Sequence, residues 1–190
     1  MAKKSIKNRF LNYGKYFIKE IIPVTAGILI ALSIGNWSEN KKDTKYVNQI
    51  LTSIQSDLNE TKMSIDEKIP DQKSLIDSLD FYSNNDSLTV LDIALKVNGF
   101  QTPTVKMNSW KSISNSKIEL IDYKKVAILS EIEEINEVLK MKTQYLMSFV
   151  YSNINSKEKN KKQTLAILFS DILSNEKDIK RIINEFEKIE

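Results

Sequence analysis

The sequence contains no cysteine and no histidine in its 190 residues. Without them the chain cannot form disulfides, thiol nucleophiles, Cys/His zinc sites, Ser-His-Asp triads or histidine-ligated haem. Only 4 glycines are present, and neither glycine-rich pattern that cradles phosphate, GxGxxG or GxxxxGK, occurs. These absences exclude most catalytic chemistry. We therefore expect a non-enzymatic protein with no catalytic residues, no cofactor and no metal.

Positive charge is concentrated at the start of the chain. The first 20 residues carry 6 basic and 1 acidic side chains, whereas the other 170 residues carry 22 basic and 24 acidic ones. A nucleic-acid-binding domain presents its basic residues as a patch on the folded surface. Because the basic residues here form a terminal block, we expect no nucleic-acid partner. We expect membrane lipid to contact five of them: Lys3, Lys4, Lys7, Arg9 and Lys15.

Apolar residues recur within this basic block at helical spacing. Ile6, Phe10, Tyr13 and Phe17 are separated by steps of four, three and four. The pattern favours an amphipathic helix that lies on an anionic leaflet. A disordered basic tail that only sets membrane topology is the alternative.

An uncharged apolar segment follows the block. Residues 21–38 form an 18-residue stretch without charge, which as a helix would span roughly 27 Å, close to the hydrocarbon thickness of a bilayer. Pro23 would fall in its first turn, where a missing N–H costs little. The stretch predicts a transmembrane helix at residues 20–38. Four residues are expected at its boundaries: Lys19, Glu20, Asn36 and Trp37.

Two alternatives explain the same apolar stretch. A cleaved signal peptide has the same order of basic and apolar regions, with Ala31-Leu32-Ser33 as a weak cleavage site. A buried core helix is the second alternative. If the segment spans a membrane, the flanking charges give its orientation, because fewer basic residues follow it than precede it. The positive-inside rule then places residues 1–19 in the cytoplasm and residues 39–190 outside it.

Three small residues repeat within the apolar segment. Gly27, Ala31 and Gly35 are spaced by four, so they share one helix face and allow another backbone to approach closely. The spacing predicts a packing surface for a partner helix or a second copy of the chain. The alternative is that small residues are simply common in membrane helices.

Residues 20–39, EIIPVTAGILIALSIGNWSE, fit the pattern E-I-x-x-V-x-x-G-I-L-I-A-L-x-I-x-N-W-x-E. This stretch resembles the N-terminal signature of an uncharacterised family of single-pass membrane proteins from Bacteroidota. A second segment resembles the family at Trp110, Ile118, Leu120 and Ile121, with Ser116 where the family usually has glycine. The resemblance implies an inner-membrane anchor and a helical extracytoplasmic domain. It implies no activity.

The rest of the chain shows helical periodicity. We predict long helices at 43–69, ended by Pro70, and at 122–154 and 164–189, with short helices near 75–79 and 88–97. Residues 100–116 are expected to form a loop, with a hidden strand pair as the alternative. The predicted fold is all-α: one N-terminal transmembrane helix followed by an antiparallel bundle of about four helices.

Two charged clusters in this region are expected to be solvated surface. The acidic cluster, with a metal or acid–base site as its alternative, consists of Glu131, Glu133, Glu134 and Glu137. The basic cluster, with a binding site for peptidoglycan, lipid or acidic protein as its alternative, consists of Lys157, Lys159, Lys161 and Lys162.

These observations predict a single-pass protein of the bacterial inner membrane with a periplasmic helical domain. Its expected role is that of a structural or accessory subunit with a protein partner or a second copy of itself. The alternative is an extracytoplasmic ligand-binding or sensor module that works with a separate output protein.

Overall fold

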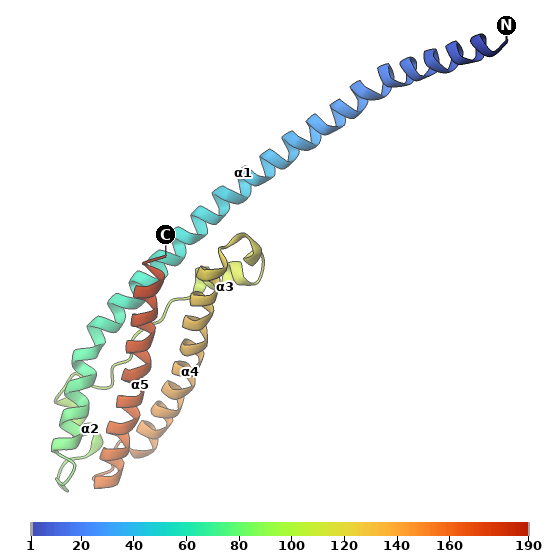
Figure 1. The fold of residues 1–190 in the computed structure, drawn as a ribbon. Helices are drawn as coiled ribbons and strands as arrows, with labels where there is room; N and C mark the ends of the chain where they lie inside the picture. The colour runs from blue at the N-terminus through green and yellow to red at the C-terminus, as the bar shows by residue number, and fades with distance from the viewer. Residues whose placement is uncertain (1, 190) are drawn as a thin grey trace. The chain divides into compact units, whose positions relative to one another are not determined.

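The computed structural model describes the backbone of residues 2–189 and the side chains of residues 16–189. Over this range the chain is all-helical, with no strand (Figure 1). The elements are α1 (Ala2–Phe81), α2 (Val90–Leu95), α3 (Asn108–Ser114), the 3₁₀ helix η1 (Ile118–Leu120), α4 (Tyr123–Asn153) and α5 (Lys159–Phe186). The all-α prediction is confirmed. The chain divides into two compact units, Met1–Asn48 and Gln49–Glu190.

The first unit consists of the first part of α1. Its basic block is helical, but the side chains of Lys3, Lys4, Lys7, Arg9 and Lys15 lie outside the described residues. Because α1 begins at Ala2, Pro23 lies inside the helix, and its expected place in a first turn is wrong. The basic block forms the first turns of the helix, so the proline lies after them.

The apolar segment of α1 is exposed up to Trp37, and Ser38 at its end is half-buried. Every described side chain from Tyr16 to Trp37 is exposed. Within the described residues, α1 is the helix long and apolar enough to cross a membrane: its most apolar 18-residue window has a mean hydropathy of 1.9 and is 0% buried. The Ser33 hydroxyl donates to the Leu29 carbonyl at 2.7 Å, so this polar group is satisfied within the helix.

The second part of α1 continues through Pro70 to Phe81, so the predicted end at Pro70 is wrong. Proline inside a helix costs about 3 kcal/mol because it removes a backbone hydrogen bond and crowds the preceding turn. Leu75 and Leu79, which follow it, are both 0% exposed. Burial of a leucine side chain is worth about 1.5–3 kcal/mol. The two leucines together therefore offset the cost of the proline.

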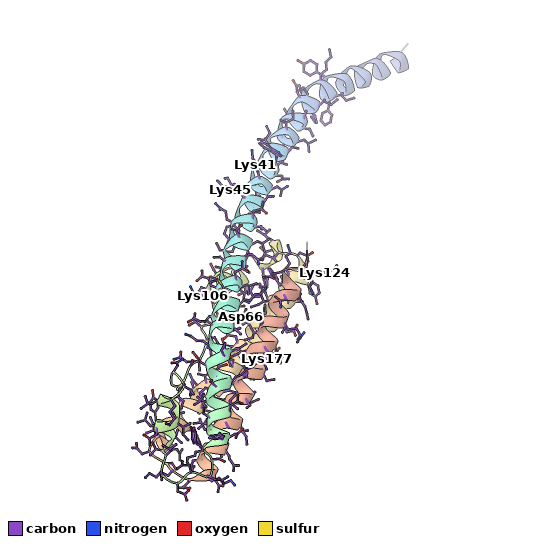
Figure 2. The ribbon with its side chains drawn as sticks, turned by 90° about the vertical axis from the view of Figure 1, so that its left-hand side faces the viewer. Lys41, Lys45, Asp66, Lys106, Lys124 and Lys177 are labelled. Atoms are coloured by element: carbon purple, nitrogen blue, oxygen red, sulfur yellow. The ribbon has the colours of Figure 1, made fainter. Side chains whose placement is uncertain are left out.

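The second unit is built on antiparallel packing of α1 and α5. Lys62 Nζ lies 3.0 Å from Glu187 Oε2, Lys180 pairs with Asp66, and Gln72 Nε2 donates to Glu176 Oε1 at 2.8 Å. The partner numbers on α5 fall as those on α1 rise, which fixes the antiparallel direction. Asp66 lies where α1 faces α5 (Figure 2).

Helices α4 and α5 are joined by a short connection and pack side by side (Figure 1). Lys142 Nζ on α4 donates to Asp171 Oδ1 at 2.9 Å and to Asn175 Oδ1 at 2.7 Å on α5. Three long helical stretches therefore pack together in this unit. The broken middle of the chain packs against them as short elements, and the count of four bundle helices stays a prediction.

An irregular segment, residues 98–107, runs along α1 in the opposite direction. Three α1 side chains bond successive backbone groups of it: Gln72 Nε2 donates to Gln101 O at 3.1 Å, Ser64 Oγ accepts from Thr104 N at 2.9 Å, and Thr61 Oγ1 accepts from Lys106 N at 2.8 Å. The segment contains no strand, so the alternative of a strand pair is wrong. The loop prediction holds for residues 101–107, but it missed α3.

Candidate functional site

Eight of the eleven buried residues of α5 fall in two rows with a spacing of seven residues. One row is entirely apolar: Leu165, Ile172, Ile179 and Phe186. The other row contains two charged residues: Lys162, Phe169, Glu176 and Ile183. Polar residues also interrupt the buried faces of the other long helices, as Gln72 on α1 and Asn136 on α4. A polar group at such a core position lowers stability unless its hydrogen bonds are satisfied.

Glu176 is the least satisfied of these residues. Its side chain is 0% exposed, and its Oε1 accepts one hydrogen bond, from Gln72 Nε2 at 2.8 Å. Its other oxygen, Oε2, is buried and has no hydrogen-bond partner among the described residues, as is also true of Gln72 Oε1. A buried carboxylate in this state lacks both a counter-ion and half of its hydrogen bonds.

Burial raises the pKa of Glu176 from its ordinary value of 4.5 to about 7, and the hydrogen bond from Gln72 opposes this shift. The physical cause is desolvation, which disfavours the charged carboxylate relative to the neutral acid. Glu176 therefore exchanges a proton near neutral pH.

Glu176 lies in the wall of a cleft of about 240 Å³. Three parts of the second unit form this cleft, namely the irregular segment, α4 and α5. The lining residues are Thr102, Pro103, Val105, Asn136, Leu139, Lys140, Thr143, Gln144 and Glu176. Asn136, like Glu176, is buried, with 3% of its surface exposed. We call this site the Glu176 cleft.

Sequence reasoning missed the Glu176 cleft. A signal was present: Phe169, Glu176 and Ile183 are spaced by seven, so the glutamate stands between two apolar residues of its heptad row. Gln72 interrupts the equivalent row of Leu58, Ile65 and Leu79 on α1. Polar residues in apolar heptad rows would have pointed to a buried polar layer.

The prediction that the whole basic cluster is solvated is wrong for Lys162. Lys162 is 0% exposed, and its Nζ donates to the carbonyls of Tyr82 at 3.2 Å and Asn85 at 2.6 Å. These carbonyls lie just after the C-terminus of α1, where unpaired carbonyls and the helix dipole attract a cation. Lys162 therefore caps the C-terminal end of α1. Lys157 and Lys159 are exposed.

The acidic cluster on α4 contributes to packing and to surface ion pairs. Glu133 Oε2 accepts from the indole N–H of buried Trp110 at 2.6 Å, which docks α3 on α4. Glu137 Oε1 lies 2.8 Å from Lys140 Nζ and 3.3 Å from Lys111 Nζ. These two lysines lower the pKa of Glu137. Among the residues whose side chains are described, no three acidic groups converge as a metal site.

The sequence-predicted residues of the membrane segment lie on the exposed first part of α1. A Cβ atom added at Gly27 or Gly35 would meet nothing within 4 Å, and Ala31 is exposed between them. Lys19, Glu20 and Asn36 are exposed as well. Trp37 is exposed, and Lys41 Nζ lies 5.2 Å from the centre of its ring.

Comparison of the chain with protein-family models, with curated proteins and with solved structures finds no match.

Proposed function

We propose that this chain is a non-enzymatic single-pass protein of the bacterial inner membrane. The observation that carries the proposal is the uncharged apolar stretch of α1, whose side chains from Ile21 to Trp37 are all exposed. Eight large aliphatic residues lie between positions 21 and 38. At about −0.3 to −0.6 kcal/mol each, their insertion into lipid contributes roughly −2 to −5 kcal/mol.

The proposed orientation has residues 1–19 in the cytoplasm and residues 39–190 in the periplasm. It is supported by the 6 basic residues that precede the apolar stretch, since basic flanks stay on the cytoplasmic side.

Membrane fractions washed with alkaline carbonate test the anchor itself. We expect the full chain to stay in the pellet; its release into the supernatant would contradict a membrane-spanning segment.

The proposed role is that of an accessory subunit that associates with a partner helix or a second copy through the membrane segment. The face at Gly27, Ala31 and Gly35 supports this role, because among the described residues no atom lies within 4 Å of a Cβ added at either glycine and Ala31 is exposed. The helical domain, proposed to be an antiparallel bundle of about four helices, would be the part that meets partners outside the cytoplasm.

The double substitution Gly27→Leu with Gly35→Leu tests this association. Bulky side chains on the small-residue face should keep two helices apart, so in-membrane crosslinking should fall and the assembly should be smaller in detergent. Ser33→Leu is the matched control, because it adds the same side chain on roughly the opposite face of the helix. Unchanged crosslinking and unchanged size for the double variant would refute the packing face.

The Glu176 cleft favours a second candidate function, ligand binding by the helical domain. Ligand sites combine a concave surface with a few converging polar groups, one of which often has a perturbed pKa. The cleft has all three features. This function needs no catalytic residue and is compatible with a membrane anchor.

A further inference from the structure

The Glu176 cleft contains an unused binding group. Oε2 of Glu176 has no hydrogen-bond partner within the part of the chain whose side chains are described, although the residue is 0% exposed. A buried carboxylate is stable only when its charge is neutralised, either by protonation or by a cation bound to it. Departures from good packing and polar satisfaction occur chiefly at functional sites.

Among the described side chains, no cation pairs with the carboxylate of Glu176. From α1, the group that contacts Glu176 is the uncharged amide of Gln72. Among the lining residues, Lys140 is the only cation, and its Nζ is 2.8 Å from Glu137. The nearby α4 lysine Lys142 pairs with Asp171.

The other elements around Glu176 add no competing charge at the cleft. The lining residues of the irregular segment, Thr102, Pro103 and Val105, are uncharged. On α5 itself, Lys180 pairs with Asp66 and lines a different surface together with Lys177. The described part of the chain therefore supplies no cation that neutralises Glu176.

We propose that the Glu176 cleft binds a small primary-ammonium compound, with its ammonium group against Glu176 Oε2. This inference deepens the second candidate function and does not depend on the membrane anchor. A primary ammonium has three N–H donors, and the lining offers uncharged acceptors on α4 and on the irregular segment. These are the hydroxyls of Thr102 and Thr143 and the amide oxygens of Asn136 and Gln144.

The size and the apolar part of the cleft set the rest of the ligand. A volume of about 240 Å³ lies below the range of drug-sized sites, roughly 300–1,000 Å³. It suits a compound with a short carbon chain, for which Leu139, Pro103 and Val105 provide apolar contact. A bare metal ion is less suited, because the lining contains one carboxylate and no other acidic ligand.

Three probes of nearly equal size and different charge test the proposal: propylammonium, 1-propanol and propionate. The isotope-labelled full chain is titrated with each probe in detergent micelles, and the side-chain amide signals of Asn136 and Gln144 are followed by NMR. We expect saturable shifts with propylammonium and none with the other two probes.

The pH dependence gives a second signature. Only ionised Glu176 attracts the cation, and its pKa is about 7 in the free protein. The apparent affinity for propylammonium should therefore be about tenfold higher at pH 8 than at pH 6. Binding should release protons in that range.

Two variants keep the test specific. Glu176→Gln keeps the shape but removes the charge, so propylammonium binding should fall at least about tenfold, and its pH dependence should vanish. Glu67→Gln is the matched control, because that side chain is 72% exposed and pairs with Lys68; its affinity should equal that of the parent. Thr143→Val, a substitution of similar shape in the lining, should weaken binding about threefold to tenfold.

Three other results would each refute a different part of the proposal. Propionate or 1-propanol binding that depends on Glu176 would refute the ammonium assignment and leave the ligand-binding function standing. Equal binding to the parent and Glu176→Gln would refute the role of Glu176. No saturable binding of any probe would overturn both the assignment and the second candidate function, whereas the carbonate wash tests the membrane anchor separately.

Discussion

Replacement of Glu176 by glutamine should stabilise the helical domain at pH 8 and change its stability much less at pH 5. The pKa of Glu176 is raised by burial from 4.5 to about 7 in the folded protein. A raised carboxyl pKa means that stability is fully present below about pH 4.5 and is lost as the pH rises through about 7. Ionisation therefore lowers the free energy of unfolding by about 3 kcal/mol at pH 8 and by about 1 kcal/mol at pH 5.

Glutamine has the shape of the neutral acid and carries no charge, so the variant avoids this loss. Its gain over the parent should be about 2 kcal/mol larger at pH 8 than at pH 5. Comparing one substitution at two pH values removes contributions from shape that do not change with pH.

The measurement is urea unfolding of the full chain in detergent, followed by tryptophan fluorescence. Trp110 is 2% exposed and lies in the domain core. A Trp37→Phe background leaves it as the only tryptophan, because the sequence contains 2. Glu67→Gln, on the exposed side of α1, should change stability by less than about 0.5 kcal/mol at both pH values.

The reasoning fails if Glu176→Gln has the same effect at pH 5 and pH 8. It also fails if the variant is less stable than the parent at pH 8 but not at pH 5. Either result would mean that the carboxylate is ionised in the folded protein without cost.

Two further substitutions test the ends of helices. Lys162→Met should lower the free energy of unfolding by about 2–3 kcal/mol, because the carbonyls of Tyr82 and Asn85 lose a charged donor. The control Lys159→Met, at an exposed site, should lower it by less than about 0.5 kcal/mol. Equal urea midpoints for the two variants would contradict the capping role of Lys162. Thr89→Ala removes the hydroxyl that accepts a hydrogen bond from the backbone N–H of Asp92, the third residue of α2, at 3.1 Å. The substitution should lower the free energy of unfolding by about 1 kcal/mol. Thermal unfolding measures this loss, and an unchanged midpoint would show that α2 does not need its cap.

The long helices of the second unit could be predicted from spacing alone. Apolar residues such as Leu129, Ile132 and Leu139 recur at helical intervals, and all three are buried in α4. Periodicity succeeds here because burial selects one face of each helix. The turn at Asn98-Gly99 was also predictable, since both residues adopt a positive φ, 63° and 79°, which asparagine and glycine tolerate best.

Three of the errors, at Pro70, Lys162 and Glu176, have a common physical origin in tertiary contacts. Pro70 predicts a helix end locally, but burial of Leu75 and Leu79 in the packed domain outweighs the local cost. Lys162 looks like a solvated lysine in sequence, and only the fold brings the end of α1 to it. The same holds for Glu176, whose cleft is formed by a segment and a helix distant in sequence.

The central claim is that residues 20–38 cross a membrane with the helical domain outside the cytoplasm. The chain has no cysteine, so single cysteines can be placed at Ser5 and, separately, at Asn84, an exposed turn residue. In cells with a permeabilised outer membrane, a membrane-impermeant maleimide should label Asn84→Cys, and it should label Ser5→Cys only after the inner membrane is disrupted. Labelling of Ser5→Cys in intact spheroplasts, or protection of Asn84→Cys, would contradict the account.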